Sequence, residues 1–207
     1  MAENPLAYAD RVRMLQGYRT VSQLLADGDN VFLDPYSVLI STHARIGVEN
    51  VFYPNVRIDA VSETLRIGDD NRFFEGTRID ATGGGRVTID SDNEFGPHAV
   101  ALMANRLGAA ITIGRGVRLL GRIDVAGVSE LGHGTQILGD INAVNVSLVG
   151  GGSHREPDPD LRGAVLKGRG RATGIVLGRG HVINGDGDFA VCPVESQSVY
   201  HPRTTQP

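Results

Sequence analysis

Apolar residues recur through the middle of the chain at intervals of six, a spacing that matches neither an α-helix nor a single long strand. Six triads follow a strict 6+6 spacing, and in five of them a glycine follows the first member. The triads are Ile46, Phe52 and Ile58; Ile67, Phe73 and Ile79; Ile89, Phe95 and Ala101; Ile113, Leu119 and Val125; Leu131, Ile137 and Ala143; and Leu177, Ile183 and Phe189. The pattern predicts hexapeptide repeats.

Such a repeat predicts an all-β solenoid, a parallel β-helix with the shape of a triangular prism. Each hexapeptide supplies one short strand and one corner, so three of them complete a coil. The apolar residue points inward and stacks on its equivalents, because a single coil cannot bury it alone. We expect Val149-Gly150 to begin a further coil between those that start at Leu131 and Leu177.

Extra residues between some coils predict four insertions, at 60–64, 81–86, 103–110 and 151–163. The phase of the triads places each insertion after the third hexapeptide of its coil. We therefore expect the four loops to leave the prism near one corner and to line a single edge. Loops on a rigid scaffold often carry function, although these could instead only widen contacts between subunits.

The two ends of the chain depart from the repeat. Residues 1–27 are predicted to contain a short N-terminal α-helix over 5–26 that caps the solenoid, because its apolar residues recur mostly every three or four positions. Residues 28–190 are predicted to form the β-helix. Residues 191–207, with several Ser, Thr, Gln and Pro residues, are predicted to form a tail or an arm packed on a neighbouring subunit.

The composition agrees with a fold of many tight corners, because the chain has 28 glycines and only 5% aromatic residues. A net charge of −4 argues against general nucleic-acid binding. No apolar run approaches the ~20 residues that span a bilayer, and the first residues lack the features of a secretory signal. The single cysteine, Cys192, excludes an internal disulfide. We therefore expect a cytoplasmic protein without a membrane partner.

Three segments carry a resemblance to a known family: Ala-Asp-Arg-Val-Arg-Met-Leu at 9–15, Phe-Leu-Asp-Pro at 32–35, and Asn-Val-Ser-Leu-Val-Gly-Gly-Gly at 145–152. With the hexapeptide pattern, they resemble the bacterial acyltransferases that have a left-handed β-helix. The likeness is to the acetyltransferase half of the bifunctional N-acetylglucosamine-1-phosphate uridyltransferase/glucosamine-1-phosphate acetyltransferase. The resemblance implies a left-handed parallel β-helix and a homotrimer with its active site between neighbouring prisms.

The same resemblance implies acetyl-CoA or another acyl-CoA as co-substrate, no permanently bound cofactor, and a histidine that acts as general base. His133, in the stretch 133–140, is the nearest match to the family's catalytic histidine, with one extra residue and no Tyr. His154 is the second candidate, because it lies in the longest insertion among polar and charged residues. Arg155 and Arg162 of that insertion are candidates for substrate binding.

A cationic, glycine-rich stretch follows at 166–180 and contains Lys167, Arg169, Arg171 and Arg179. Backbone amides exposed by glycine, beside Lys and Arg, suit a pyrophosphate or a 3′-phosphate. We predict that these four residues bind the cofactor, and the alternative is that they are ordinary charged positions on strand faces.

The function predicted from the sequence is an acyl-CoA-dependent acyltransferase acting on a small amine, sugar or nucleotide-sugar. One alternative is a repurposed β-helix protein of specialised metabolism, either an enzyme of another reaction class or a non-catalytic binding or scaffold protein. A metal-dependent lyase or hydratase is a third possibility. No metal site is predicted, because none of the six histidines pairs with another at the short spacing of a local zinc motif.

Overall fold

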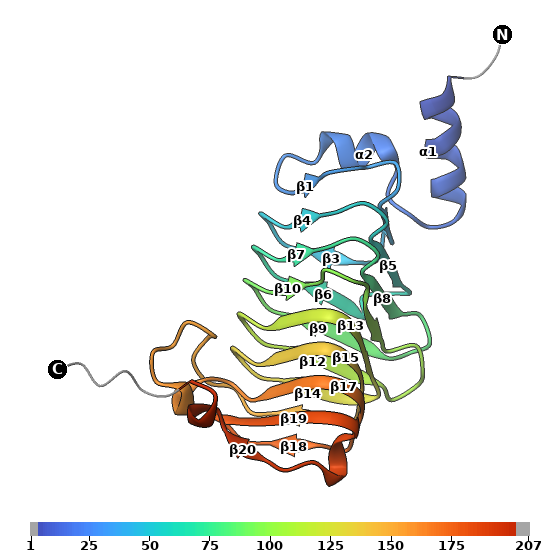
Figure 1. Ribbon diagram of the computed structural model, residues 1–207. Coiled ribbons are helices and arrows are strands. Elements are labelled where there is room, and N and C mark those ends of the chain that lie inside the picture. The colour runs from blue at the N-terminus through green and yellow to red at the C-terminus, as the bar shows by residue number, and fades with distance from the viewer. Residues whose placement is uncertain (1–3, 202–207) are drawn as a thin grey trace.

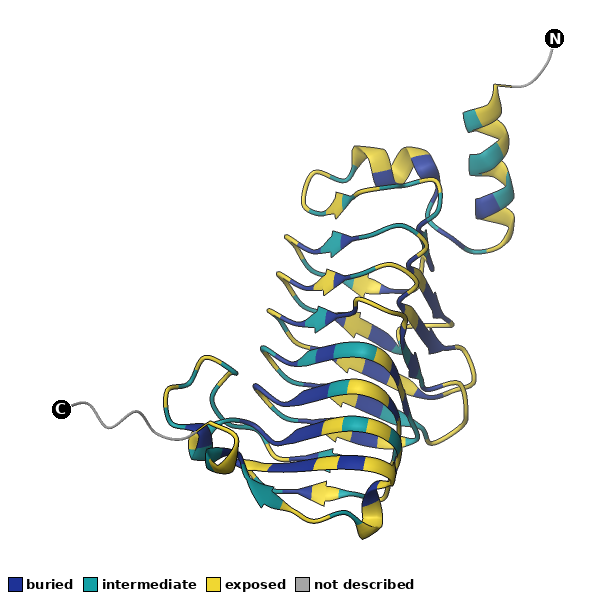
Figure 2. Cartoon of the chain, in the orientation of Figure 1, coloured by how far each residue is buried: buried dark blue, intermediate teal, exposed yellow. Residues whose placement is uncertain are grey.

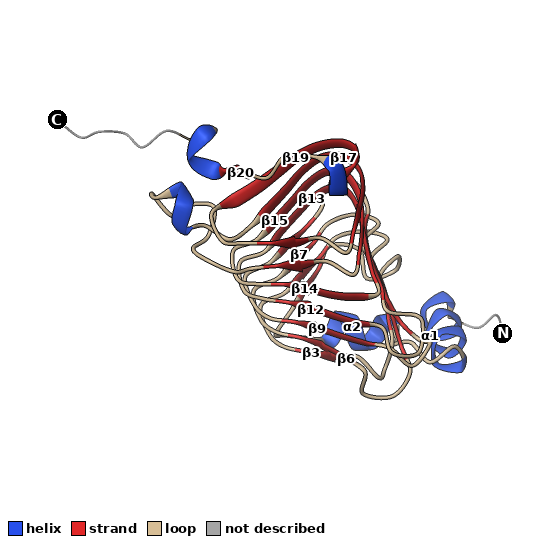
Figure 3. Ribbon diagram, turned by 90° about the horizontal axis from the view of Figure 1, so that it is seen from below, coloured by secondary structure: helices blue, strands red, loops and turns tan. Residues whose placement is uncertain are grey.

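The computed structural model describes residues 4–201, which form the predicted β-solenoid (Figure 1). The chain passes in turn along three faces of the prism, named here A, B and C. Neighbouring coils pair strand on strand, and every pairing between coils is parallel. Helices lie only near the two ends of the solenoid (Figure 3). Because the hydrogen bonds run along the stack, each residue position repeats as a column from one coil to the next.

Face A begins with β1 (Val31–Phe32), β4 (Val51–Phe52), β7 (Arg72–Phe73) and β10 (Glu94–Phe95). Face B begins with β2 (Leu39–Ile40), β5 (Arg57–Ala60), β8 (Arg78–Ala81) and β11 (Val100–Met103). Four longer strands then run through both faces: β13 (Arg118–Ala126), β15 (Gln136–Val144), β17 (Val165–Thr173) and β19 (His181–Asp188). Face C consists of β3 (Arg45–Ile46), β6 (Leu65–Ile67), β9 (Arg86–Ile89), β12 (Ala110–Ile113), β14 (Val128–Leu131), β16 (Ser147–Leu148) and β18 (Val176–Leu177).

The long strands bend from face A to face B at a column of glycines, Gly121, Gly139, Gly168 and Gly185. Gly139 has a φ of 125°, which disfavours residues with a side chain. A Cβ atom added there would also lie 1.9 Å from the carbonyl oxygen of Gly168. Glycine is therefore needed at this bend both for the backbone conformation and for the close approach of successive coils.

Phenylalanine side chains stack inside face A. The rings of Phe32, Phe52, Phe73 and Phe95 lie nearly parallel, with successive centroids 5.0, 5.0 and 4.9 Å apart. In later coils the same column continues as Leu119, Ile137, Leu166 and Ile183. Figure 2 shows the buried residues alternating with exposed ones along the strands. Burial of one such side chain contributes roughly 1.5–3 kcal/mol, so the stack joins the coils into one core.

Two predicted core positions are wrong by one residue. Leu102, rather than Ala101, pairs with Ile79 and is fully buried, because the turn after Phe95 contains one more residue than in the coils before it. Leu148, rather than Val149, pairs with Leu131 and Leu177, and Val149 is exposed. In both cases the residue chosen from the six-residue spacing faces outward, and the apolar residue next to it in the sequence faces the core.

The prediction that four insertions line one edge is correct for three of them. Residues 60–64, 81–86 and 103–110 connect face B to face C, at the B/C corner. Residues 151–163 instead follow β16 of face C and precede β17 of face A, so this loop leaves the prism at the C/A corner. The loop appears in orange at the left of Figure 1. The longest insertion therefore lies at a different corner of the prism from the other three, because it follows a strand of face C instead of face B.

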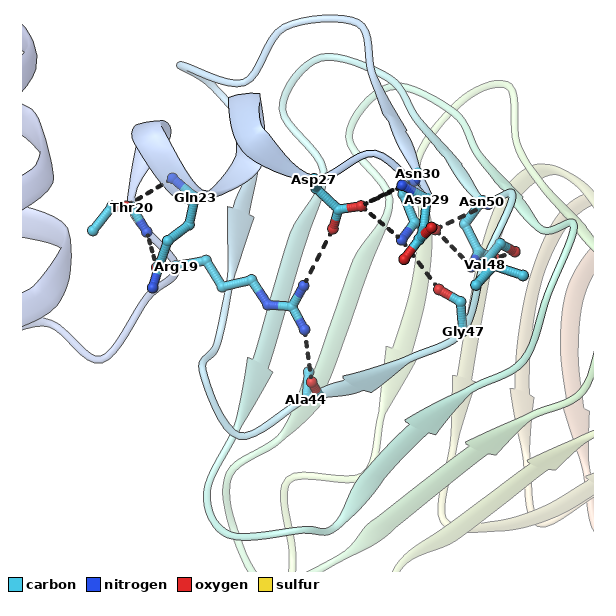
Figure 4. A network of polar contacts seen from close by, with 10 residues as sticks. All are labelled: Arg19, Thr20, Gln23, Asp27, Asp29, Asn30, Ala44, Gly47, Val48 and Asn50. Atoms are coloured by element: carbon cyan, nitrogen blue, oxygen red, sulfur yellow. Dashed lines mark hydrogen bonds and ion pairs between the residues drawn. The ribbon is translucent and has the colours of Figure 1, made fainter.

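Asparagines, all but the first of them buried, form a hydrogen-bonded ladder inside the C/A corner. The Oδ1 atoms of Asn30, Asn50 and Asn71 each accept bonds of 2.9–3.1 Å from the backbone N–H and the Nδ2 group of the next asparagine. Asn93 ends the ladder by accepting the Val117 N–H. Figure 4 shows its start, where Asn30 also donates to the Gly47 carbonyl at 3.1 Å. The ladder satisfies polar groups that this corner would otherwise bury unpaired.

The N-terminal region contains two helices instead of the single one expected. Helix α1 (Pro5–Leu15) ends before Gly17, which has a φ of 77°. Helix α2 (Val21–Ala26) begins with a capping box formed by Thr20 and Gln23. Leu24 of α2 joins the solenoid core, so the shorter helix covers the open end. Helix α1 lies outside the stack in Figure 1.

At the other end, residues 189–201 pack on the last coil of their own chain. Strand β20 (Glu195–Ser196) pairs antiparallel with β19, in contrast to all pairings between coils. The buried side chain of Gln197 donates to the Gly163 carbonyl at 2.7 Å. Short 3₁₀ turns at Pro159–Leu161, Phe189–Val191 and Gln197–Val199 complete this end. Of the predicted tail or arm, residues 191–201 pack on their own chain, and 202–207 lie outside the described residues. Contact of this segment with a neighbouring subunit stays a prediction.

The asparagine ladder gives a prediction about stability. The change Asn71→Ala removes the acceptor of two groups of Asn93, whose backbone N–H is then buried without a partner. We expect a loss of roughly 1–3 kcal/mol in the free energy of unfolding, since that is the cost of one unsatisfied buried group. Urea unfolding measures this loss, with Asn105→Ala at an exposed insertion as control. Equal stability of the two variants would contradict the role given to the ladder.

Candidate functional site

A groove runs along the outside of the C/A corner and has a volume of about 640 Å³. We call it the corner groove. Its walls come from the turns between faces C and A, from outward residues of face A, and from the beginning of the loop at 151–163. Six successive C/A turns contribute to it, from Glu49 at one end to His154 and Arg155 at the other. At about 4.8 Å between paired strands, the groove extends for roughly 24 Å along the prism.

Three acidic side chains occupy equivalent turn positions along one wall. Glu49, Asp70 and Asp92 have φ values of 61°, 57° and 61°, so each turn adopts the same left-handed conformation. Each precedes an asparagine of the buried ladder, which explains why the three carboxylates recur at the same place in successive coils. Together they give this end of the groove a negative wall.

Arginines face these carboxylates, and some are already paired across coils. The Nε atom of Arg115 donates to Asp92 at 2.6 Å, and the Nε atom of Arg118 donates to Glu94 at 3.0 Å. The Arg115–Asp92 pair is exposed and the Arg118–Glu94 pair is half-buried. Ion pairs near the surface contribute little to stability, commonly below about 1 kcal/mol. These two pairs instead hold two guanidinium groups in the wall of the groove.

His133, a sequence-predicted catalytic residue, lines the corner groove from the turn before β15. Its Nδ1 atom accepts the backbone N–H of Arg115 at 2.8 Å. This hydrogen bond assigns the neutral ring the tautomer that carries its proton on Nε2. Nε2 of His133 is then a hydrogen-bond donor, and protonation at Nδ1 would break the bond to Arg115. The geometry suits donation to a ligand better than removal of a proton.

His154, the other predicted catalytic residue, also lines the groove and is half-buried. Its Nδ1 atom is buried and has no hydrogen-bond partner among the described residues. Burial is the main cause that lowers the pKa of His154 below its ordinary value, followed by the nearby charges of Arg118 and Arg155, while Glu94 acts in the opposite direction. The imidazole is therefore neutral near pH 7, which is the state a general base requires.

A second cavity of about 370 Å³ opens on the outer side of face A. Its apolar floor consists of Leu138, Val165 and Val182, and its polar rim includes Arg162 and Lys167. The C-terminal turn with Gln197, Tyr200 and His201 forms another wall. We call it the outer cavity. Arg118 and His154 line both this cavity and the corner groove, so these two side chains lie where the two spaces meet.

The structure brings together some of the sequence-predicted residues. His133, His154 and Arg155 line the corner groove, while Arg162 and Lys167 line the outer cavity. Arg162 also donates through Nε to the Glu156 carbonyl at 2.7 Å, which holds the loop closed on itself.

The other three cations of the glycine-rich stretch line neither space. Arg169 forms two bonds of 2.9 Å with Asp186 in the next coil. Arg171 points outward from β17, and Arg179 lies in the turn before β19. The glycines between them are used for the close stacking of coils, since a Cβ at Gly168 or Gly170 would meet a carbonyl oxygen at 2.0 Å.

Several groove residues were not identified from the sequence, among them Arg72, Glu94 and Arg118. A signal for the acidic wall is visible in hindsight, because an acidic residue precedes an asparagine at 49–50, 70–71 and 92–93. No comparable signal marks Arg118, whose importance depends on its position near His154 of the loop at 151–163.

Two further features bear on the chemistry. Within residues 4–201, no cluster of three His, Cys, Asp or Glu side chains has an arrangement that could hold a metal ion. Neither helix of the described chain has the length and apolar character needed to cross a membrane.

Comparisons with known proteins identify no family for this chain. No family model matches the sequence, and no curated protein matches it. Among solved structures, PerB from Caulobacter crescentus, crystallised in complex with CoA and GDP-perosamine, aligns with 91% of this chain and 67% of its own. The identity is 16% and the TM-score is 0.26. The predicted likeness to the acetyltransferase half of the bifunctional enzyme therefore stays a prediction.

The environment of His154 gives a prediction that needs no substrate. We expect its pKa, followed by NMR of the ring protons, to lie below the ordinary value of about 6.5. The change Arg155→Gln removes a nearby positive charge, so it should raise that pKa towards the ordinary value. Arg179→Gln, outside the groove, should leave it unchanged. A wild-type pKa at or above the ordinary value would contradict this description of the site.

Proposed function

We propose that the chain is an acyl-CoA-dependent acyltransferase that acts on a small amine, sugar or nucleotide-sugar. The observation that carries the proposal is the position of His154, a neutral imidazole at the junction of two spaces. A two-substrate transfer needs a base at the point where acceptor and donor meet. The β-solenoid and the sequence resemblance to hexapeptide acyltransferases support the choice of reaction class.

In this proposal the acceptor lies in the corner groove and His154 removes its proton. The acceptor nitrogen or oxygen attacks the thioester carbonyl, and its proton passes to Nε2 of His154. The tetrahedral intermediate then collapses, the C–S bond breaks, and the proton is returned to the leaving thiolate. Direct transfer of this kind needs no covalent acyl-enzyme. General-base catalysis of such a step is typically worth 10²–10⁴-fold in rate.

His133 has a different role in the proposal. Because its Nδ1 atom accepts the Arg115 N–H, its Nε2–H is available to donate to an oxygen of the acceptor or of the thioester. We assign it to orientation and charge stabilisation, and His154 to proton transfer. The two histidines predicted from the sequence thus become partners with separate tasks.

The outer cavity suits the acyl donor. Its floor of Leu138, Val165 and Val182 is apolar enough for an extended thiol-bearing arm, and Lys167 and Arg162 are placed at the rim for phosphate oxygens. Both spaces open on the outside of the prism. A neighbouring protomer of the homotrimer expected from the resemblance would cover them.

The first test is catalytic. The purified chain is incubated with acetyl-CoA and panels of amines, sugars and nucleotide-sugars, and free thiol is measured. His154→Gln should lower kcat/KM by about 10²–10⁴-fold for the accepted substrate. His133→Asn keeps an acceptor for the Arg115 N–H and a donor for the ligand, so we expect a smaller loss, within about tenfold.

Calorimetry provides the matching control. The wild type and His154→Gln should bind acetyl-CoA equally, because the variant loses a base and keeps the outer cavity. Full activity in His154→Gln would overturn the assignment of the base. Absence of acetyl-CoA binding by the wild type would overturn the proposed reaction class. Binding without turnover of any acceptor in the panels would favour the alternative of a non-catalytic binding protein.

A further inference from the structure

A polar cavity of about 410 Å³ lies on face B near the N-terminal end, away from the corner groove. Its walls come from the segment between the two N-terminal helices, from β5 and β8, and from the turns that follow these strands. Both strands have the sequence Arg-Ile-Asp-Ala, at 57–60 and 78–81. The tetrapeptides pair residue for residue, so Arg57 lies beside Arg78 and Asp59 beside Asp80.

Packing of the core accounts for the inward-facing isoleucines of the two tetrapeptides, but it does not account for their outward-facing arginines and aspartates. Ile58 and Ile79 are fully buried in the prism. The arginine and aspartate of each strand alternate with the inward residues and face the cavity. In the next coil the outward column continues as Ala101 and Met103, so the fold does not require charges there.

The carboxylates of Asp59 and Asp80 are buried, and both accept hydrogen bonds from neighbouring side chains of the protein itself. Asp59 is 7% exposed and Asp80 is 5% exposed. Asp59 accepts from the Tyr18 hydroxyl at 2.5 Å and from Nε of Arg57 at 2.7 Å. Asp80 accepts from the hydroxyl of Thr82 at 2.7 Å and from Nη2 of Arg78 at 3.2 Å. The carboxylates therefore hold the guanidinium groups in place rather than face a ligand.

The two guanidinium groups keep capacity for a ligand. Their side chains are each 49% exposed, although the aspartates that hold them are buried. Besides its bond to Asp59, Arg57 donates Nη2 to the Tyr18 oxygen at 2.8 Å, and its guanidinium lies 5.8 Å from the Tyr18 ring centroid. The remaining N–H groups of Arg57 and Arg78 have no partner within residues 4–201. An arginine has five N–H donors in a planar fork, a geometry that matches carboxylate and phosphate oxygens.

We propose that this cavity is a binding site for a small oxyanion, held between the paired guanidinium groups of Arg57 and Arg78. Strand pairing sets the two arginines about 4.8 Å apart, close enough for both to contact one phosphate or carboxylate group. Their aspartates and Tyr18 hold them before the ligand arrives, which reduces the entropy lost on binding. The site lies at another edge of the prism from His154, and its existence does not depend on the proposed acyl transfer.

Calorimetric titration of the full chain at low ionic strength tests the proposal. Inorganic phosphate and succinate are used in separate experiments, so that the two kinds of oxyanion are distinguished. We expect at least one of them to bind, and its affinity to fall as salt is added. Arg78→Gln should weaken that binding by about tenfold or more, as expected for lost charged hydrogen bonds. Arg78→Lys keeps the charge but loses the planar fork, and should also weaken it.

Two control variants locate the binding. Arg86→Gln changes an exposed arginine of face C, and Arg155→Gln changes a cation of the corner groove. Both should retain the wild-type affinity. The proposal is overturned if the wild type binds neither anion, if Arg155→Gln abolishes the binding, or if folded Arg78→Lys binds as tightly as the wild type. A melting curve of each variant establishes that it is folded.

Discussion

The parallel register between coils is the constraint on which the rest of the structure depends. Each coil satisfies its backbone hydrogen bonds only through the coils above and below it, and each buries its apolar residues only against theirs. Once the register is set, every position becomes a column. The inward columns contain the stacked phenylalanines and the asparagine ladder, while the outward columns bring together residues about 20 positions apart in the sequence. Both candidate binding regions are made of such columns.

Arginines and carboxylates pair differently in the two candidate binding regions. In the corner groove, arginines pair with carboxylates of another coil, as Arg118 does with Glu94. On face B, Arg57 and Arg78 pair with an aspartate two residues further along the same strand. The first arrangement joins coils along the wall of an open groove. The second holds each guanidinium within its own coil and leaves neighbouring guanidinium groups free to act together. The same pair of residue types thus builds two different surfaces.

Much of the fold could be predicted because the inward residues obey a strict spacing. The errors arose where that spacing admits two answers: at Ala101 beside Leu102, and at Val149 beside Leu148. A periodic pattern cannot tell which of two adjacent apolar residues faces inward when a turn is lengthened or shortened by one residue. The loop at 151–163 was placed on the wrong edge for a different reason, because the interval between two coil starts gives the length of an insertion but not the corner at which it leaves the prism.

The candidate site was only partly predictable for a related reason. His133, His154 and Arg155 were found because their residue types, or the length of the loop, set them apart from the repeat. Arg118 and Glu94 are outward residues of face A strands, where no periodic requirement applies, and only the three-dimensional path of the loop gives them importance. The predicted cationic stretch had the right composition, but the register of β17 with β19 uses Arg169 for an ion pair.

The antiparallel strand β20 has a consequence for the size of the molecule. A stack of parallel coils has no intrinsic length, since its last coil offers the same unpaired backbone edge that every earlier coil offered to its successor. A second copy could in principle continue the stack there. Strand β20 occupies part of that edge in the opposite direction, and the buried Gln197 fixes the chain over the last coil. Reversing the chain for one short strand therefore blocks part of the edge to which a further parallel coil would add.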